Sequence, residues 1–241
     1  MRLDKLLLDR GLVPSRQRAQ SLILAGRVLV DEQKVEKAGA SVQENSKVRL
    51  LGGDLRYVSR GGIKLEHALR HWNIPLEGRT CLDIGTSTGG FVDCMLQHGA
   101  AAVIAVDTGK GQIAAKLRAN PRVRLLENYN ARYLKSEDVP ECVTFLSMDV
   151  SFISATLVLP AVMNAVRKTL SEAVVLVKPQ FEAGRAAVSE GGIVRDPEAQ
   201  TAALKRVSDT VSSLGGVEVD SLESPITGAE GNREFLLYAR F

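Results

Sequence analysis

Lys178 stands at the end of an aliphatic run, Ala173 to Val177, and Pro179 follows it at once. A lysine in this place is either a solvated strand end or an amine held at the mouth of a site. A buried amine can act as a base, because burial favours its neutral form. Two carboxylates have comparable positions, since Asp149 ends one hydrophobic segment and Glu234 precedes another. Together, these groups could remove a proton from a neutral acceptor such as a hydroxyl.

The order of the segments determines whether these groups meet. From residue 80 onward strand-like and helix-like stretches alternate, which is typical of a doubly wound, largely parallel α/β sheet with helices on both faces. Ligands bind beyond the carboxyl ends of such strands. A short loop returns into the last strand, so that strand should be antiparallel and should bring Glu234 to the same edge as Asp149 and Lys178. One charge at a strand end is ordinarily solvent-exposed, but three at one edge indicate a site. The expected strands are Thr80 to Ile84, Val103 to Val106, Val123 to Leu126, Val143 to Met148, Ala173 to Val177, Val217 to Leu222 and Phe235 to Ala239.

A glycine-containing turn follows the first of these strands. In CLDIGTSTGGF, Asp83 precedes Gly85, Gly89 and Gly90, which let the backbone approach a ligand closely. After the second strand, Asp107 can accept hydrogen bonds from ribose hydroxyls. The turn is not G-x-G-x-x-G, and no G-x-x-x-x-G-K-[ST] sequence is present, which disfavours dinucleotides and nucleoside triphosphates. We therefore expect S-adenosylmethionine, with Asp83 paired to its ammonium group.

The residues after the fourth strand help to identify the methyl acceptor. Amino-group methylation of adenine or cytosine usually uses [DN]-P-P-[YF] there, whereas this chain has DVSF at residues 149 to 152. Carbon-5 methylation of a pyrimidine needs a nucleophilic cysteine. Cys142 precedes a strand, and Cys81 and Cys94 have apolar neighbours that indicate core positions. Ribose is therefore the best acceptor.

Composition favours a cytoplasmic protein without a structural metal. The 241 residues are 45% hydrophobic, which suits one large or two small domains. No apolar run approaches the roughly 20 residues that cross a bilayer, and Asp4 and Asp9 interrupt the N-terminal leucines, so we expect neither a signal peptide nor a membrane anchor. The odd number of cysteines suggests a reducing compartment. His67 and His71 could share a helix face, but no third metal ligand is evident, so we expect a surface or packing role.

The first 60 residues differ from the rest in charge. They contain 12 Lys and Arg against 7 Asp and Glu, whereas the remaining residues are close to neutral. Leucines at helical spacing predict two short helices, which are followed by small strands. Gly11 and Gly26 are expected at the ends of the two helices, and Ser15 is expected to cap the second one. Arg16 and Arg18 lie in the first turn of the second helix, where the helix dipole disfavours cations, so phosphate contact explains them better than helix stability does. On charge alone, nucleic acid binding and a solvated basic face remain equal alternatives.

The same segment resembles a known RNA-binding module. RLDKLLLDRGLVPSRQRAQSLILAGRVLVDEQKVEKAG is similar to the S4 domain, which is named for a small-subunit ribosomal protein. Asp31 and Glu32 stand in the turn where Asn-Gly is usual. The resemblance implies an RNA-binding domain of residues 1 to 59 with a linker at residues 52 to 60. The residues that we expect to contact RNA are Arg2, Lys5, Arg16, Arg18 and Arg27.

The whole chain, including the N-terminal module, resembles a methyltransferase family, with residues 60 to 241 as its catalytic domain. SRGGIKL, LDIGTSTGGF, MDVSFIS, VKPQFEAG, EGGIVRDP and SPITGAEGNREF occur in the order of the hemolysin-A-like TlyA family of ribosomal RNA 2′-O-methyltransferases, whose catalytic domain is FtsJ-like. The resemblance implies a Rossmann-like, seven-stranded sheet, S-adenosylmethionine as cofactor, and cytidines of ribosomal RNA or ribosomal subunits as substrate. It implies a catalytic tetrad of Lys64, Asp149, Lys178 and Glu234. The expected cofactor-binding residues are Asp83, Gly85, Thr86, Ser87, Gly89, Gly90, Asp107 and, near the adenine, Asn130.

The four tetrad residues have different expected roles. Lys178 would remove the ribose proton while the methyl group leaves sulfur, with burial and the charge of Lys64 favouring its neutral form. Asp149 and Glu234 would hold the lysines and the ribose in line. Two other functions remain open, a membrane-damaging cytolysin, which the family's historical name suggests, and a catalytically silent RNA-binding assembly factor. The absence of a membrane segment disfavours the first, and the intact tetrad and cofactor turn disfavour the second.

Overall fold

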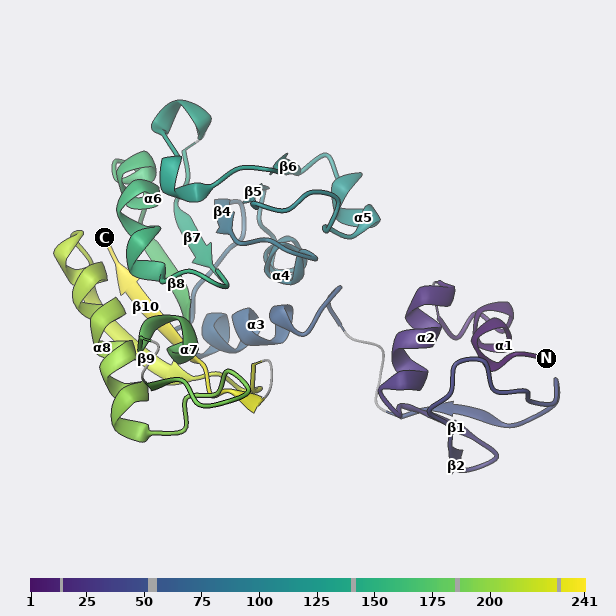
Figure 1. Ribbon diagram of the computed structural model, residues 1–241. Helices are drawn as coiled ribbons and strands as arrows, with labels where there is room; N and C mark the ends of the chain where they lie inside the picture. Colours follow the sequence, from purple (N-terminus) through teal and green to yellow (C-terminus); the bar gives the residue numbers. More distant parts are fainter. Residues whose placement is uncertain (14, 52–55, 140–141, 185–186, 229–230) are drawn as a thin grey trace. The chain divides into compact units, whose positions relative to one another are not determined.

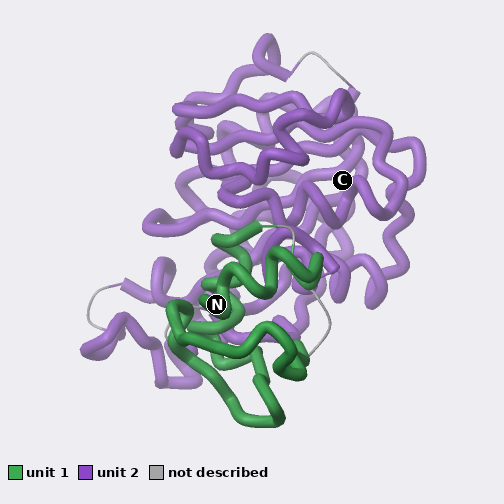
Figure 2. Tube along the Cα trace, turned by 90° about the vertical axis from the view of Figure 1, so that its right-hand side faces the viewer, with its two compact units in different colours: residues 1–55 green, residues 56–241 purple. Residues whose placement is uncertain are grey.

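Contacts within the computed structural model divide the chain into two units, Met1–Leu55 and Arg56–Phe241 (Figure 2). The structure describes all residues except 14, 52–55, 140–141, 185–186 and 229–230. Residues 52 to 55 of the expected linker therefore lie outside the described residues, and residues 56 to 60 belong to the second unit. No helix within the described ranges is long and apolar enough to span a membrane.

The first unit packs two helices against a three-stranded antiparallel sheet. Leu3, Leu7 and Ile23 bury the apolar faces of the helices against the strand residue Val28. The Ser15 hydroxyl accepts a hydrogen bond from the backbone N–H of residue 18 at 3.2 Å, as the capping pattern predicts. The elements are α1 Leu3–Asp9, α2 Arg16–Leu24, β1 Val28–Val30, β2 Gln33–Lys34 and β3 Val48–Leu50, and the sheet order is β2-β1-β3.

A seven-stranded sheet forms the centre of the second unit, in the order β6-β5-β4-β7-β8-β10-β9 (Figure 1). β10 is antiparallel to β8 and β9, whereas the other neighbouring strands are parallel. The predicted α/β fold with a reversed last strand is thus confirmed. One strand starts later than expected, at Phe145 instead of Val143. The strands are β4 Thr80–Ile84, β5 Ala102–Val106, β6 Val123–Leu126, β7 Phe145–Met148, β8 Glu172–Val177, β9 Val217–Glu223 and β10 Phe235–Arg240.

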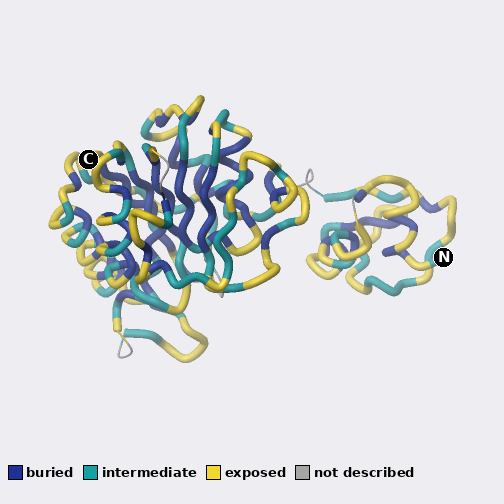
Figure 3. The backbone as a smooth tube through the Cα atoms, turned by 90° about the horizontal axis from the view of Figure 1, so that it is seen from above, coloured by how far each residue is buried: buried dark blue, intermediate teal, exposed yellow. Residues whose placement is uncertain are grey.

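Helices cover both faces of this sheet and enclose two hydrophobic clusters. Successive strand residues point to opposite faces, so Leu82 enters the cluster under α6 and α8, whereas its neighbour Cys81 enters the cluster under α3 and α4. Figure 3 shows the resulting layer of buried strands. The helices are α3 Gly61–His71, α4 Gly90–Gln97, α5 Ala115–Arg118, α6 Leu159–Val166, α7 Pro179–Glu182 and α8 Pro197–Ser213, with short 3₁₀ turns η1 Ala131–Tyr133, η2 Ser136–Asp138 and η3 Ala155–Leu157.

The hairpin between β1 and β2 contains a strained two-residue turn. Val30 pairs with Gln33, so Asp31 and Glu32 form the turn, and both have positive φ angles of 50° and 64°. Turns of this type favour Asn-Gly, because a side chain at positive φ costs free energy. The exposed ion pair between Glu32 and Arg49, at 2.7 Å, recovers little of this cost.

We predict that Glu32→Gly stabilises the first unit by about 0.5 kcal/mol, because relief of strain exceeds the added entropy of the unfolded chain. Amide hydrogen exchange of β1 in the full chain measures the change. The control variant Glu32→Gln removes the ion pair but keeps the strain, and it should give no stabilisation. Faster exchange in Glu32→Gly than in the wild type would show that the ion pair outweighs the strain.

Candidate active site

Two adjoining cavities lie at the carboxyl ends of the central parallel strands. The larger has a volume of about 600 Å³ and the smaller about 400 Å³. Because they share part of their lining, a ligand in one would lie beside a ligand in the other. The shared residues are Gly85, Ser87, Asp149, Ser151 and Phe152.

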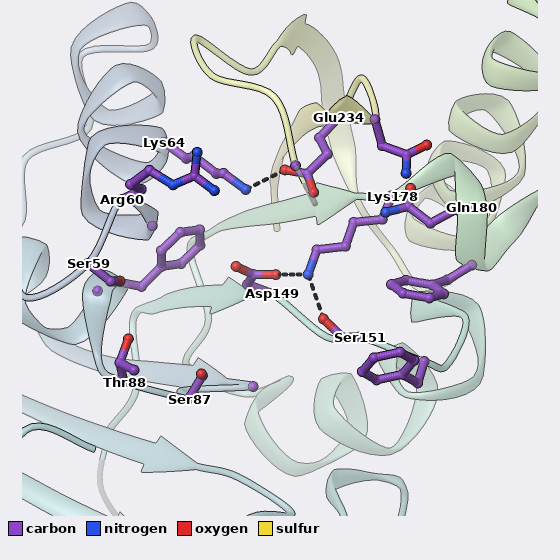
Figure 4. A pocket seen from close by; sticks show the side chains of 18 of the residues that line it. Ser59, Arg60, Lys64, Ser87, Thr88, Asp149, Ser151, Lys178, Gln180 and Glu234 are labelled. Carbon is purple, nitrogen blue, oxygen red and sulfur yellow. Dashed lines mark hydrogen bonds and ion pairs between the residues drawn. The ribbon is translucent and has the colours of Figure 1, made fainter. Parts of the chain in front are cut away.

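Lys178 lies directly after β8 and reaches the larger cavity (Figure 4). Its Nζ atom is 2.5 Å from Asp149 Oδ1 and donates a hydrogen bond to Ser151 Oγ at 2.8 Å. Only 11% of the Lys178 side chain is exposed. The amine is therefore largely shielded from water and is held by two groups at the end of β7, the neighbouring strand.

Lys64 and Glu234 form a second ion pair in the same cavity. Lys64 lies on α3, and its Nζ atom donates a hydrogen bond to Glu234 Oε2. The two side chains are 11% and 3% exposed. A Cβ atom at Gly228 would overlap with the Glu234 carboxylate, so a side chain there would displace this carboxylate from its present position. All four residues of the expected tetrad thus line one cavity, and each lysine has its own carboxylate.

Close packing of α3 on α4 determines where Lys64 lies. A Cβ atom at Gly90 would overlap with Ser59 Oγ and would lie only 3.0 Å from the backbone nitrogen of Gly62. Glycine at position 90 thus lets the start of α3 approach the start of α4. Lys64, in the first turn of α3, is thereby brought to the cavity.

The glycine turn after β4 approaches Asp149 closely. Gly85 has a φ of 84°, and a Cβ atom there would overlap with the Asp149 carbonyl group. Asp107 stabilises the turn, because its carboxylate accepts hydrogen bonds from the backbone N–H groups of Ser87 at 2.7 Å and Gly109 at 2.6 Å. Asp107 also lines the smaller cavity, where a ribose contact was expected.

Asp83 lies beneath this turn and lines neither cavity. It pairs in register with Ser147 of β7, and both side chains point to the same face of the sheet, where Ser147 Oγ donates a hydrogen bond to Asp83 Oδ1 at 2.7 Å. Burial raises the pKa of the Asp83 carboxyl group to about 7. The structure therefore does not bring Asp83 to the cavity surface, where pairing with a cofactor ammonium group was expected. Thr86, one residue beyond Gly85, does line the larger cavity.

The smaller cavity has mainly apolar walls and a few polar groups. Apolar groups that include Ile84, Val106 and Val158 form its walls, and Asp107 and Asn130 contribute polar groups. The Asn130 side-chain oxygen accepts a hydrogen bond from the backbone N–H of residue 132 at 3.1 Å, which orients its carboxamide. Apolar walls with a few oriented polar groups are typical of cofactor sites.

The larger cavity is also lined by polar residues that were not predicted from the sequence. Ser151 follows Asp149 by two residues, but its hydroxyl carries no charge and gave no signal of its own. Ser59 and Arg60 reach the cavity because α3 begins there, and Gln180 reaches it because α7 turns directly after Lys178 (Figure 4). These positions depend on tertiary packing.

In the first unit, two of the residues expected to contact RNA share one buried carboxylate. Arg2 and Arg16 form ion pairs with Asp4 at 3.0 and 2.9 Å. The guanidinium of Arg2 holds the pKa of Asp4 well below its usual range. Arg27 donates a hydrogen bond to the Leu51 carbonyl at 2.9 Å. The other two expected residues are the exposed Lys5 and the half-buried Arg18.

Comparison with known proteins is consistent with this architecture. The FtsJ-like methyltransferase family model matches residues 57–241, and the S4 domain model matches residues 1–48. YqxC of Bacillus subtilis, whose name describes an rRNA methyltransferase, is 44% identical over 98% of this chain and 84% of its own length. The 16S/23S rRNA (cytidine-2′-O)-methyltransferase TlyA of Mycobacterium tuberculosis is 41% identical over 99% of this chain and 89% of its own length.

A solved structure from Streptococcus thermophilus that carries a hemolysin name has a TM-score of 0.76 and 42% identity, and the match covers 100% of this chain and 88% of that one. The resemblance that the sequence motifs indicated is thus confirmed along the whole chain. The chain belongs to the FtsJ-like methyltransferases and, among them, to the TlyA family that carries an N-terminal S4 domain.

Proposed function

We propose that the protein transfers a methyl group from S-adenosylmethionine to the 2′-hydroxyl of cytidines in ribosomal RNA. The observation that carries this proposal is the pair of lysine–carboxylate contacts, Lys178 with Asp149 and Lys64 with Glu234, in one cavity beside a nucleoside-sized one. The name of the Mycobacterium tuberculosis relative supports cytidine as the target nucleotide.

The smaller cavity and the glycine turn are the proposed place of the cofactor. Asp107 would accept hydrogen bonds from ribose hydroxyls, and Asn130 would contact the base. The close approach of Gly85 to Asp149 would place the reacting end of the cofactor next to the larger cavity. When bound, S-adenosylmethionine supplies an electrophilic methyl group on a positively charged sulfur. Thr86, Ser87, Gly89 and Gly90 would complete the turn, with Asp83 supporting it from below.

Lys178 is the proposed general base. Its Nζ atom, held by Asp149 and Ser151, reaches the larger cavity and would accept the proton of a ribose hydroxyl bound there.

The other three residues would orient the reacting groups. Asp149 and Ser151 hold the Lys178 amine at the end of β7, and this fixes the direction from which it approaches a hydroxyl. Glu234 holds Lys64, whose N–H groups could stabilise negative charge that develops on the ribose oxygen. This arrangement requires no covalent intermediate.

The first unit is proposed to bind the ribosomal RNA. Asp4 fixes the guanidinium groups of Arg2 and Arg16 before RNA arrives, and a preorganised guanidinium loses less entropy when it binds a phosphate. Lys5, Arg18 and Arg27 would add to this surface.

We predict that Lys178→Ala lowers the single-turnover rate on unmodified ribosomal RNA at least about 100-fold, because general-base catalysis contributes that much or more. Affinity for S-adenosylmethionine, measured by calorimetry, should change less than about threefold. The control variant Lys205→Ala removes an exposed lysine on α8 that pairs with Asp209, and it should keep the wild-type rate. A Lys178→Ala protein with most of the wild-type rate would refute the base assignment.

Asp107→Ala should show the converse behaviour. Loss of a charged hydrogen-bond acceptor and of the support for the turn should weaken S-adenosylmethionine binding about 10- to 100-fold. The rate at saturating cofactor should fall much less than in Lys178→Ala. Calorimetry and single-turnover kinetics on the same preparations separate the two effects, and unchanged cofactor affinity would exclude Asp107 from the cofactor site.

Replacing Arg16 and Arg18 together with alanine should weaken ribosomal RNA binding and reduce its salt dependence. Each lost phosphate contact should lower the slope of log K against log salt by about 0.7 to 0.9. Filter binding across a salt series measures the slope. Arg49→Ala, which removes an exposed arginine of the same unit, is the control and should leave the slope unchanged. If the double variant has the wild-type slope, these arginines do not contact phosphates.

A further inference from the structure

Two segments that carry the proposed catalytic groups are joined by polar contacts at two points, and also by a contact between the rings of Phe152 and Phe181, whose centroids are 5.3 Å apart. The β7 loop, residues 149–154, contains Asp149 and Ser151, and the β8 segment, residues 178–182, begins with Lys178 and contains α7. The contacts of Lys178 with Asp149 and Ser151 are the first junction. Glu182, at the other end of the β8 segment, makes the second.

Glu182 is a buried carboxylate, only 3% exposed. Its Oε2 atom accepts a hydrogen bond from Ser154 Oγ at 2.5 Å, and its Oε1 atom accepts one from the backbone N–H of Ala155 at 2.7 Å. Burial raises the pKa of this carboxyl group above its usual value. A carboxylate is costly to bury unless its hydrogen bonds are satisfied, so these two bonds tie the end of the β7 loop firmly to α7.

The β8 segment transmits this constraint to Lys178. Pro179 restricts the backbone after Lys178, and α7 is a single turn in which Ala183 N–H bonds to the Pro179 carbonyl at 2.8 Å. The Phe181 N–H also bonds to the Lys178 carbonyl at 2.9 Å. Lys178 and Glu182 are therefore the two ends of one short, hydrogen-bonded unit.

The β7 loop needs to be fixed at both ends. Phe152, between Ser151 and Ser154, has a φ of 63° and is 92% exposed. A bulky residue at positive φ is strained, and such a conformation persists only where the surrounding structure imposes it. Asp149 N–H bonds to the Ile84 carbonyl at 2.8 Å at the start of the loop, and Glu182 holds its end.

We propose that Glu182 is a positioning residue that sets the place of Ser151 and Asp149 relative to the Lys178 amine. Glu182 lines neither cavity of the site and acts through the β7 loop alone. This inference rests on the proposed function. Without Glu182 the loop relaxes around Phe152, and the groups that orient Lys178 move away from the line of proton transfer.

The test compares Glu182→Ala and Glu182→Gln in single-turnover methylation of unmodified ribosomal RNA at saturating concentrations. Displacements of about 1 Å can cost about 100-fold in rate, so Glu182→Ala should be slower by about 10- to 100-fold. Its affinities for RNA and S-adenosylmethionine should stay within about threefold of the wild type. Glutamine can bond to both Ser154 and Ala155 N–H, so Glu182→Gln should keep a rate within about threefold. Ser154→Ala should slow the reaction, and combining it with Glu182→Ala should add little.

Glu172 provides a matched control at the other end of β8. Its carboxylate accepts hydrogen bonds from Arg79 Nη1 at 2.6 Å and the Tyr238 hydroxyl at 2.8 Å, far along the strand from the cavity. Glu172→Ala should lower the unfolding temperature comparably but keep the wild-type rate. The inference is overturned if Glu182→Ala keeps the wild-type rate, or if Glu172→Ala loses as much rate.

Lys178→Ala is measured alongside these variants. If it retains activity, the general-base assignment fails, whereas a wild-type protein that methylates no ribosomal RNA would refute the proposed function itself. An inactive Lys178→Ala protein with a fully active Glu182→Ala protein refutes only the positioning role. If Glu182→Ala does not fold, Ser154→Ala decides, because it removes one of the two bonds and leaves the carboxylate in place. A wild-type rate in Ser154→Ala would then overturn the inference.

Discussion

A lysine can lie at a largely buried sheet edge only if a carboxylate or another acceptor compensates the loss of water. Two lysines are held in this way in one cavity, each against its own carboxylate. This constraint determines much of the surrounding architecture. β7 and β8 must end side by side so that Asp149 meets Lys178, and β10 must run antiparallel so that Glu234 returns to the same edge. α3 must begin against α4 so that Lys64 reaches Glu234, 170 residues away in sequence.

The same pairing also fixes the direction of the Lys178 amine. Asp149 and Ser151 hold Nζ at the larger cavity, so a hydroxyl group bound there would meet the amine in a defined orientation. The close approach of Gly85 to the Asp149 carbonyl, which leaves no room for a side chain, joins the two cavities at this point.

Much of this site could be predicted from the sequence, for a topological reason. Lys178 and Asp149 follow hydrophobic strands and Glu234 precedes one, and the strand order of an α/β sheet brings these ends to one edge. Lys64 could not be predicted in this way, because strand order does not determine which side chain of a helix reaches the edge of the sheet. Only the family resemblance identified Lys64. The alternation of side chains along β4 could have indicated that Asp83 points to a face of the sheet and not into the cavity. Its register with Ser147 places it below the turn. The individual ion pairs, the contact of Ser151 and the bridge from Glu182 arise from tertiary packing between distant segments, which local sequence patterns do not encode.

The position of the transferred methyl group tests the central claim most directly. Wild-type protein is incubated with labelled S-adenosylmethionine and unmodified ribosomal subunits, and the product is mapped by nuclease digestion and mass spectrometry. The target is then rebuilt with a single 2′-deoxynucleotide at the mapped position, which keeps the base and removes only the acceptor oxygen. The account predicts a methyl group on the ribose of the natural RNA, and binding without methylation at that nucleotide of the deoxy RNA. A methyl group on the base, or methylation of the deoxynucleotide itself, would contradict it.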